Sequence, residues 1–314
     1  MSEIINLNEL AKHFSDEEKA RELLEKLRWK NGVVCPHCES VGAYKIEASS
    51  TKGRKARKGL WKCKGCKEQF TVTVGTIFES SRIPLNKWLL AIHLVCSSKK
   101  GMSAHQLHRM LGITYKSAWF LAHRIRFAMT QEPLFSKLSG TVEVDETYVG
   151  GKAKNMHKSE REKRIQGRGT VGKAPVVTLV ERDGRVKSQY MESVTGENLK
   201  KALLEFVDIN ACVNTDESPS YSFVQREFAK HESVNHKKDE YVRGNSHVNT
   251  CESVHALLKR GIIGTFHHVS KQHLHRYLSE FDFRFNARKV SDGERTLQAI
   301  QGFEGKRLMY KTSN

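Results

Sequence analysis

Two CxxC pairs constrain the fold of the N-terminal part of this chain more than any other feature of its sequence. The first pair is Cys35 and Cys38 in "CPHC", and the second is Cys63 and Cys66 in "CKGC". Each pair offers two thiolates from one tight loop, and a tetrahedral zinc ion takes four such ligands. The residues between the pairs must then form short strands that bring both loops together. The spacing therefore predicts a zinc ribbon over residues 31–80, with a structural ion because four thiolates leave no open position for water.

The other candidate ligands near this site are expected to play no part in it. Free thiols or a redox pair are the alternatives to zinc for the four cysteines. His37 lies inside the first loop, where we expect a bystander and not a ligand. Cys96, Cys212 and Cys251 lie in apolar surroundings and are expected to be small buried hydrophobic residues.

Helical patterns flank the ribbon on both sides. Residues 1–30 predict an N-terminal helical segment in which Ser15 and Glu18 form a capping box. Residues 81–135 predict further helices, broken at Gly101 and Gly112.

The stretch "MSAHQLHRMLGITYKSAWFLAHRIRFAM" is typical of a helix-turn-helix. Ser103 can cap its first helix, Gly112 can end that helix, and Thr114 can cap the second. A second helix of this kind can enter the major groove of DNA with its N-terminal residues on base edges. An ordinary helical hairpin is the alternative. The candidate DNA-binding residues are Tyr115, Lys116, Arg124 and Arg126.

The charge of the chain favours a polyanionic partner. The formal net charge is +18, from 53 Lys and Arg against 35 Asp and Glu. No run approaches the ~20 apolar residues that a membrane helix needs. The first ten residues lack the basic and apolar regions of a signal peptide. We therefore expect a cytoplasmic, nucleoid-associated protein that binds nucleic acid and not a membrane.

Two basic segments, residues 50–59 and 152–169, are either solvated loops or tracks for DNA phosphates. In the first segment the candidate contacts are positions 56 and 58. Of these Lys58 is charged, whereas Ala56 is not. In the second segment the candidates are Lys163 and Arg164.

From residue 139 onward, strand and helix patterns alternate. Strand patterns occupy 141–149, 174–181, 186–194, 211–216 and a segment near 232–242. Helical patterns occupy 195–207, 220–228, 249–260 and 270–287. This order predicts an α/β domain over residues 136–305, with a mixed sheet covered by helices.

Acidic residues occur in three elements of this domain. Asp145 lies within the strand pattern "VEVDETYVGG", and Asp216 ends the apolar strand "ACVNTD". In "NTCESVHALLKRGI", Glu252 and Lys259 share one stripe of a helix. Carboxylates of this kind can hold a pair of Mg²⁺ ions, and such a pair supports phosphodiester chemistry.

Alternatives remain open for each of these acids. Any one of them, taken alone, is also explained as an unrelated surface residue. Glu143 or Glu146 could take the place of Asp145, and Glu217 that of Asp216.

Three motifs resemble the DDE-type transposases of bacterial insertion sequences. They are "VEVDETYVGGK", "TDES.SY" and "NTCESVHALLKRGIIGTFHHVSKQHLHRYLSEFDFRFNAR". The chain is most similar to the ISXO2-like group, which carries an N-terminal zinc ribbon and is related to the Merlin transposases of eukaryotes. The resemblance covers about residues 15–305. It includes 35 residues between Asp216 and Glu252, a spacing familiar in DDE recombinases.

The resemblance implies an RNase H-like catalytic domain with Asp145, Asp216 and Glu252 as its triad. Two Mg²⁺ or Mn²⁺ ions would bind there, while Lys259 and Arg260 would contact DNA. The zinc ribbon and the helix-turn-helix would bind the terminal inverted repeats of an insertion sequence. A homodimer or larger assembly on double-stranded DNA would then cleave each transposon end and join it to target DNA.

Two other functions remain as alternatives. One is a structure-specific nuclease on the same fold, which cuts without joining. The other is a zinc-dependent transcriptional regulator, which binds DNA without chemistry.

Overall fold

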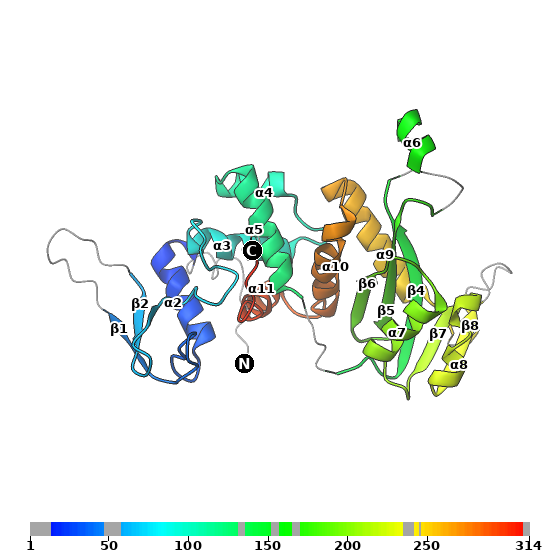
Figure 1. The fold of residues 1–314 in the computed structure, drawn as a ribbon, viewed down its shortest axis with the longest axis horizontal. Helices are drawn as coiled ribbons and strands as arrows, with labels where there is room; N and C mark the ends of the chain where they lie inside the picture. The colour runs from blue at the N-terminus through cyan, green and yellow to red at the C-terminus, as the bar shows by residue number, and fades with distance from the viewer. Residues whose placement is uncertain are drawn as a thin grey trace. The chain divides into compact units, whose positions relative to one another are not determined.

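Two units make up the chain, and Figure 1 shows the elements of each. The computed structural model describes residues 14–46, 58–130, 136–151, 157–164, 170–234, 242–244 and 246–309. Unit 1 comprises Met1–Met129 and Val290–Asn314, and unit 2 comprises Thr130–Lys289. The chain therefore leaves the first unit, builds the second and returns.

The first part of unit 1 is a three-stranded antiparallel ribbon in the order β1-β2-β3. Its strands are β1 (Ala43–Ile46), β2 (Leu60–Cys63) and β3 (Gln69–Phe70). Helix α2 (Glu17–Arg28) precedes the ribbon and turns Ala20 and Leu24 inward.

The N-cap of α2 is Asp16, so the expected capping box at Ser15 is wrong. The Asp16 carboxylate accepts hydrogen bonds from the backbone N–H groups of Glu18 and Lys19, at 2.8 and 2.9 Å. Asp16 also has the extended backbone that a cap requires.

The rest of unit 1 is helical. It contains α3 (Leu85–Ser97), α4 (Ala104–Leu111), α5 (Tyr115–Ala128) and α11 (Asp292–Gln301). The three expected turn residues around α4 and α5 are confirmed. The Ser103 and Thr114 hydroxyls accept from the N–H groups of Gln106 and Ser117, and Gly112 is left-handed at φ 58°.

Helix α11 packs against α3 and α5, although the sequence analysis included it in the α/β domain. The His93 ring of α3 meets the Thr296 hydroxyl of α11 at 2.9 Å, and both side chains are buried. The α/β unit therefore ends at Lys289 and not at 305.

Unit 2 is built on a five-stranded mixed sheet in the order β6-β5-β4-β7-β8. The strands are β4 (Thr141–Val149), β5 (Ala174–Glu181), β6 (Val186–Tyr190), β7 (Cys212–Asp216) and β8 (Lys230–Val234). Strand β4 pairs antiparallel with β5 and parallel with β7. This arrangement confirms the predicted mixed α/β sheet.

Helices cover both faces of this sheet (Figure 1). One face packs against α7 (Gly196–Phe206), the 3-10 turn η3 (Pro219–Tyr221) and α8 (Val224–Glu227). The other face packs against α9 (Asn249–Gly261), the π-helix η5 (Ile262–Phe266) and α10 (Lys271–Asn286). The short helix α6 (Lys158–Arg164) lies between β4 and β5 in the chain.

Strand alternation in β4 assigns its side chains to these two faces. Val142 and Val144 join the apolar core on the α7 side. Glu143 and Asp145 therefore point to the α9 side, where polar residues at the start of α9 meet them. The position of the acids is a direct consequence of the pleat.

No described helix of the protein is both long enough and apolar enough to cross a membrane.

Candidate functional site

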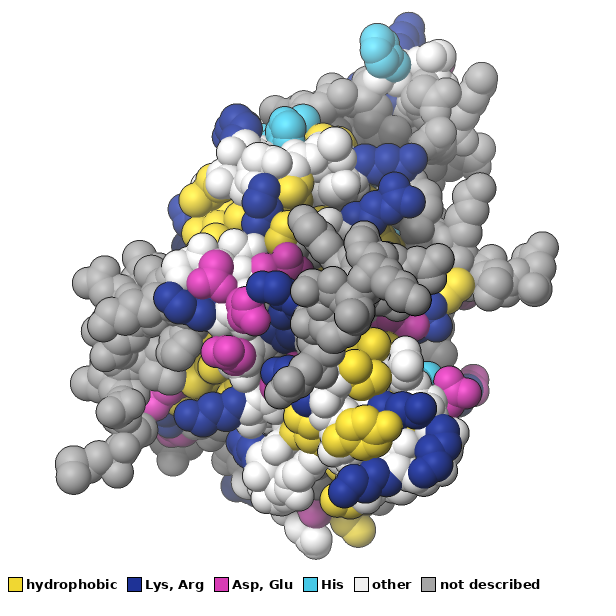
Figure 2. All heavy atoms as spheres, turned by 90° about the vertical axis from the view of Figure 1, so that its left-hand side faces the viewer, with side chains coloured by type: hydrophobic (Ala, Val, Ile, Leu, Met, Phe, Trp, Pro, Cys, Tyr) yellow, Lys and Arg dark blue, Asp and Glu magenta, His cyan; other side chains and the backbone are white. Residues whose placement is uncertain are grey.

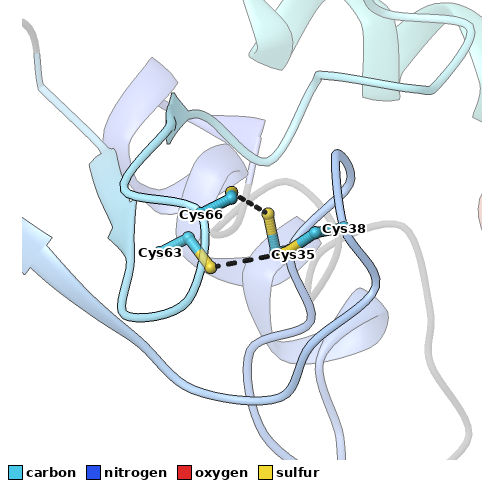
Figure 3. Close-up of side chains that lie close together, drawn as sticks. All are labelled: Cys35, Cys38, Cys63 and Cys66. Carbon is cyan, nitrogen blue, oxygen red and sulfur yellow. Dashed lines mark hydrogen bonds between the residues drawn. The ribbon is translucent and has the colours of Figure 1, made fainter.

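The four cysteines of the two CxxC pairs converge in the ribbon (Figure 3). Their sulfur atoms all lie within 4.8 Å of one another. The Sγ atoms of Cys35 and Cys66 are 3.7 Å apart, as are those of Cys38 and Cys63. Four sulfur donors at this separation fit the tetrahedral coordination of zinc.

Backbone and hydroxyl donors surround these sulfurs. The N–H groups of His37 and Gly65 point to the Sγ atoms of Cys35 and Cys63, at 3.4 and 3.3 Å. The Ser40 hydroxyl lies 3.3 Å from Cys63 Sγ and, as the largest contribution, lowers the pKa of that thiol to about 6. Such contacts favour the thiolate, which is the form that binds metal.

The sequence analysis missed the contribution of Ser40, because nothing in the CxxC pattern points to it. His37 is exposed, and its ring edge packs on Phe70 with the centroids 6.3 Å apart. The histidine is therefore no part of the cysteine cluster, as expected.

The parallel pairing of β4 with β7 brings two of the predicted acids together. The register pairs Val142 with Val213 and Glu143 with Asn214. Asp145 and Asp216 each lie two residues beyond this last pair, Asp145 in the middle of β4 and Asp216 at the end of β7. Strand alternation turns both side chains to the α9 side of the sheet.

Helix α9 lies over this position. Its buried stripe of Cys251, Val254 and Leu258 packs toward the sheet. Glu252 and His255 follow at a spacing of three residues, which places them on adjacent turns of the same side. The His255 Nδ1 atom lies 3.4 Å from Asp145 Oδ2, whereas Glu252 is exposed.

Glu143 holds the beginning of α9. Its carboxylate accepts hydrogen bonds from the Thr250 N–H at 2.8 Å, the Thr250 hydroxyl at 3.0 Å and the Cys251 N–H at 3.4 Å. Arg182 forms an ion pair with the same group at 3.1 Å. The N-cap residue of α9, Val248, makes no side-chain hydrogen bond, so Glu143 supplies the acceptor that this helix end needs.

These contacts weigh against the two alternatives within β4. Glu143 is fully buried and its oxygens are already engaged. Glu146 falls on the α7 side of the strand, where the Tyr221 hydroxyl donates to it at 2.6 Å. Burial raises the pKa of Glu146 to about 7, and the nearby Asp216 and Asp145 act in the same direction. Asp145 also faces α9, but unlike Glu143 it is only partly buried.

The three predicted acids are less tightly grouped than the cysteines. Within the described residues, the cysteines form the only set of three or more candidate ligands whose atoms all lie within 4.8 Å. Asp145, Asp216 and Glu252 therefore lie on neighbouring elements without all their oxygens meeting at that distance.

The predicted DNA-binding residues of α5 divide into exposed and buried ones. Tyr115 is 44% exposed and stacks on His105 with the ring centroids 4.2 Å apart, and Lys116 is exposed beside it. Arg124 is 5% exposed, and it donates to the carbonyl oxygens of Leu308 and Glu79 at 3.0 and 2.9 Å. A guanidinium that is buried and hydrogen-bonded in this way is not accessible to DNA.

Arg126, the other predicted contact in α5, is 3% exposed. The expectation that Arg124 and Arg126 contact DNA is therefore wrong. Both arginines lie on a stretch of α5 that is buried on several sides, which their spacing in the sequence does not reveal.

The chain segment that contains α3, α4 and α5 has basic residues but no acidic ones. The sequence contains no Asp or Glu between Glu79 and Glu132. Figure 2 shows Lys and Arg side chains, in dark blue, interspersed with Asp and Glu side chains, in magenta, on the face turned to the viewer.

The other predicted DNA contacts have mixed positions. Lys58 is exposed and forms an ion pair with Glu18 at 2.7 Å. Lys259 and Arg260 are exposed at the end of α9. Position 56 and the side chains of residues 163 and 164 lie outside the described part of the protein.

Comparison with known proteins yields two family matches and one relative. An ISXO2-like transposase domain matches residues 137–286, and a transposase zinc-ribbon domain matches residues 15–69. The chain is 32% identical over 286 residues to the uncharacterized protein in transposable element ISH50 of Halobacterium salinarum. The alignment covers 87% of this chain and 92% of the relative. The two matched ranges contain the three acids and the four cysteines, respectively.

Proposed function

Since this chain belongs to the family of ISXO2-like transposases, we propose that it binds the ends of an insertion sequence and catalyses DNA cleavage and strand transfer. The observation that supports this proposal is the parallel pairing of β4 with β7, whose last pair, Glu143 with Asn214, comes two residues before Asp145 and Asp216. The contact of His255 with Asp145 adds that the helix of Glu252 lies against β4.

The sheet topology supports an RNase H-like catalytic domain. The strand order β6-β5-β4-β7-β8 places the first strand of the unit at the centre, with its second and third strands on one side. The fourth and fifth strands lie on the other side and run parallel to the first. Asp145 is on the first strand of this unit and Asp216 ends the fourth.

The donor set suits hard divalent cations. Asp145, Asp216 and Glu252 offer only carboxylate oxygens, which Mg²⁺ and Mn²⁺ prefer. Two such ions, when bound, supply Lewis-acid activation of the attacking oxygen and stabilisation of the leaving one. Burial raises the pKa of Glu146 to about 7, and the negative charges of Asp216 and Asp145 act in the same direction.

The remaining residues have roles that follow from their positions. Glu143 fixes the start of α9 and so holds Glu252 over the aspartates. Lys259 lies two turns after Glu252 on the same helix and is exposed, so that it can contact a phosphate near the scissile bond. Tyr115 and Lys116 begin α5 and can reach base edges or phosphates of the terminal repeats.

The direct test is a cleavage and joining assay with zinc-loaded protein, Mg²⁺ and a supercoiled plasmid that carries the ends of the element. Asp145→Asn and Asp216→Asn should each lower the rate by more than roughly 100-fold, because each removes a charged cation ligand. Binding to the same ends should persist. The matched control is Glu205→Gln, since Glu205 is an exposed helical acid on the opposite face of the sheet. Full activity in either aspartate variant would refute the assignment.

The same assay separates the alternatives. Ends that are cleaved but never joined would identify a nuclease. Tight binding without Mg²⁺-dependent cutting would identify a regulator.

A further inference from the structure

His255 of α9 lies beside Asp145 of β4. Its side chain is buried, with 5% of the residue exposed. The Nδ1 atom faces Asp145 Oδ2 at 3.4 Å, while Asp145 Oδ1 accepts a hydrogen bond from the Glu146 N–H at 2.8 Å. Asp145 Oδ1 is therefore hydrogen-bonded to the backbone, and the His255 ring is an ion-pair neighbour of Oδ2.

The environment of the ring argues against a space-filling role alone. The Nε2 atom of His255 is buried, and no hydrogen-bond partner meets it within the described structure. A buried polar atom without a partner is unfavourable, so an apolar ring of the same size would serve better if packing were the only need. The polar ring is useful only through its other nitrogen, which faces the carboxylate.

The position of His255 relative to Glu252 adds a second argument. Glu143 accepts hydrogen bonds from Thr250 and Cys251, and Asp145 contacts His255 one helical turn later. Two carboxylates that are two residues apart on β4 thus contact α9 on either side of Glu252. Together, the Glu143 and Asp145 contacts fix the position of α9 along β4.

We propose that His255 is a positioning residue for the cation site. Its Nδ1 atom, 3.4 Å from Asp145 Oδ2, would hold that carboxylate in place for the cations that Asp145, Asp216 and Glu252 would bind. This inference rests on the proposed function, because it assigns a role within that site. His255 itself touches neither DNA nor cation.

Calorimetric titration of Mn²⁺ into the full-length, zinc-loaded protein tests the inference without relying on activity. His255→Phe keeps the ring and removes the donor, and it should weaken Mn²⁺ binding by roughly 10- to 100-fold. His255→Asn places an amide N–H near the position of Nδ1 and should bind Mn²⁺ almost as the unchanged protein does. In the cleavage assay, His255→Phe should need a correspondingly higher Mn²⁺ concentration for half-maximal rate.

His273→Phe is the matched control, because His273 is a partly buried histidine on α10 of the same unit. It should leave the Mn²⁺ affinity unchanged. Thermal unfolding of each variant shows whether it is folded. If both His255 variants have a lowered melting temperature, His255→Phe can still be compared with His255→Asn.

The possible outcomes separate the inference from the proposed function. If Asp145→Asn abolishes Mn²⁺ binding while His255→Phe binds normally, the inference is overturned and the function stands. If His255→Asn is as impaired as His255→Phe, the donor is not what matters and the inference is also overturned. If the unchanged protein binds no Mn²⁺, or Asp145→Asn binds it equally well, the proposed cation site fails and the inference fails with it.

Discussion

The cysteine cluster and the acidic site differ in how completely the fold assembles them. The four sulfurs already lie within 4.8 Å of one another, whereas the three carboxylates are gathered on neighbouring elements without reaching that distance. Each cysteine pair comes from a single short loop, and two backbone contacts to sulfur shape those loops. The acids come from two strands and a helix that are far apart in the sequence.

Charge accounts for much of this difference. Thiols can approach one another while they are protonated, but ionised carboxylates repel at short range. The effect is visible at Glu146, whose pKa is raised to about 7 by burial and by the nearby Asp216 and Asp145. In the proposed site, bound cations would offset this repulsion among Asp145, Asp216 and Glu252.

Removing zinc should have the largest effect. Structural zinc in small domains contributes about 10–16 kcal/mol of folding free energy. Cys63→Ser should therefore lose stoichiometric zinc and unfold the ribbon, as measured by metal content and by hydrogen exchange of β1 to β3. Cys212→Ser, at a cysteine outside the cluster, should keep its zinc. Full zinc retention in Cys63→Ser would show that the cluster is not a four-cysteine site.

Removing the contacts of Glu143 with the start of α9 should have the second largest effect. Glu143→Gln leaves Arg182 without its buried partner and weakens the hydrogen bonds to Thr250 and Cys251. Losing one member of a buried charged pair costs about 3–5 kcal/mol. The midpoint of denaturant unfolding of unit 2 should fall, with zinc content unchanged. A variant as stable as Glu205→Gln would show that Glu143 does not hold the helix.

The pH dependence of unit 2 should report on Glu146. Its pKa rises from 4.5 in the unfolded chain to about 7 in the folded protein. Between these values the folded protein holds a proton that the unfolded chain has released. The free energy of unfolding should therefore fall as pH rises from 4.5 to 7, by about 2 kcal/mol from this residue. Glu146→Gln should flatten that slope, and an unchanged slope would contradict the burial argument.

The smallest expected effect concerns DNA binding by α5. Lys116→Ala should lower the salt dependence of DNA binding by about one unit of slope, because one phosphate contact is lost. Arg124→Ala should instead lower the melting temperature, since Arg124 binds two carbonyl oxygens inside unit 1. If Arg124→Ala lowered the salt dependence of DNA binding while the melting temperature stayed the same, Arg124 would be a DNA contact after all.

The sequence predicted those features that depend on local spacing. CxxC pairs and turn residues such as Gly112 act over a few residues, and the structure confirms them. The strand and helix patterns also predicted a mixed sheet, which the structure confirms.

Features that depend on long-range packing were missed or misjudged. Glu143 caps a helix that starts more than a hundred residues later, and no local pattern reveals that contact. For the same reason, the sequence did not predict that Arg124 is buried or that α11 packs in unit 1. A signal for Glu143 existed, because α9 begins without an N-cap of the usual type.

Anomalous diffraction from crystals of the zinc-loaded protein soaked in Mn²⁺ tests the central claim most directly. The account predicts manganese peaks within about 2.5 Å of carboxylate oxygens of Asp145 and Asp216, with Glu252 completing the set. Manganese at full occupancy elsewhere, with both aspartates bare, would contradict it.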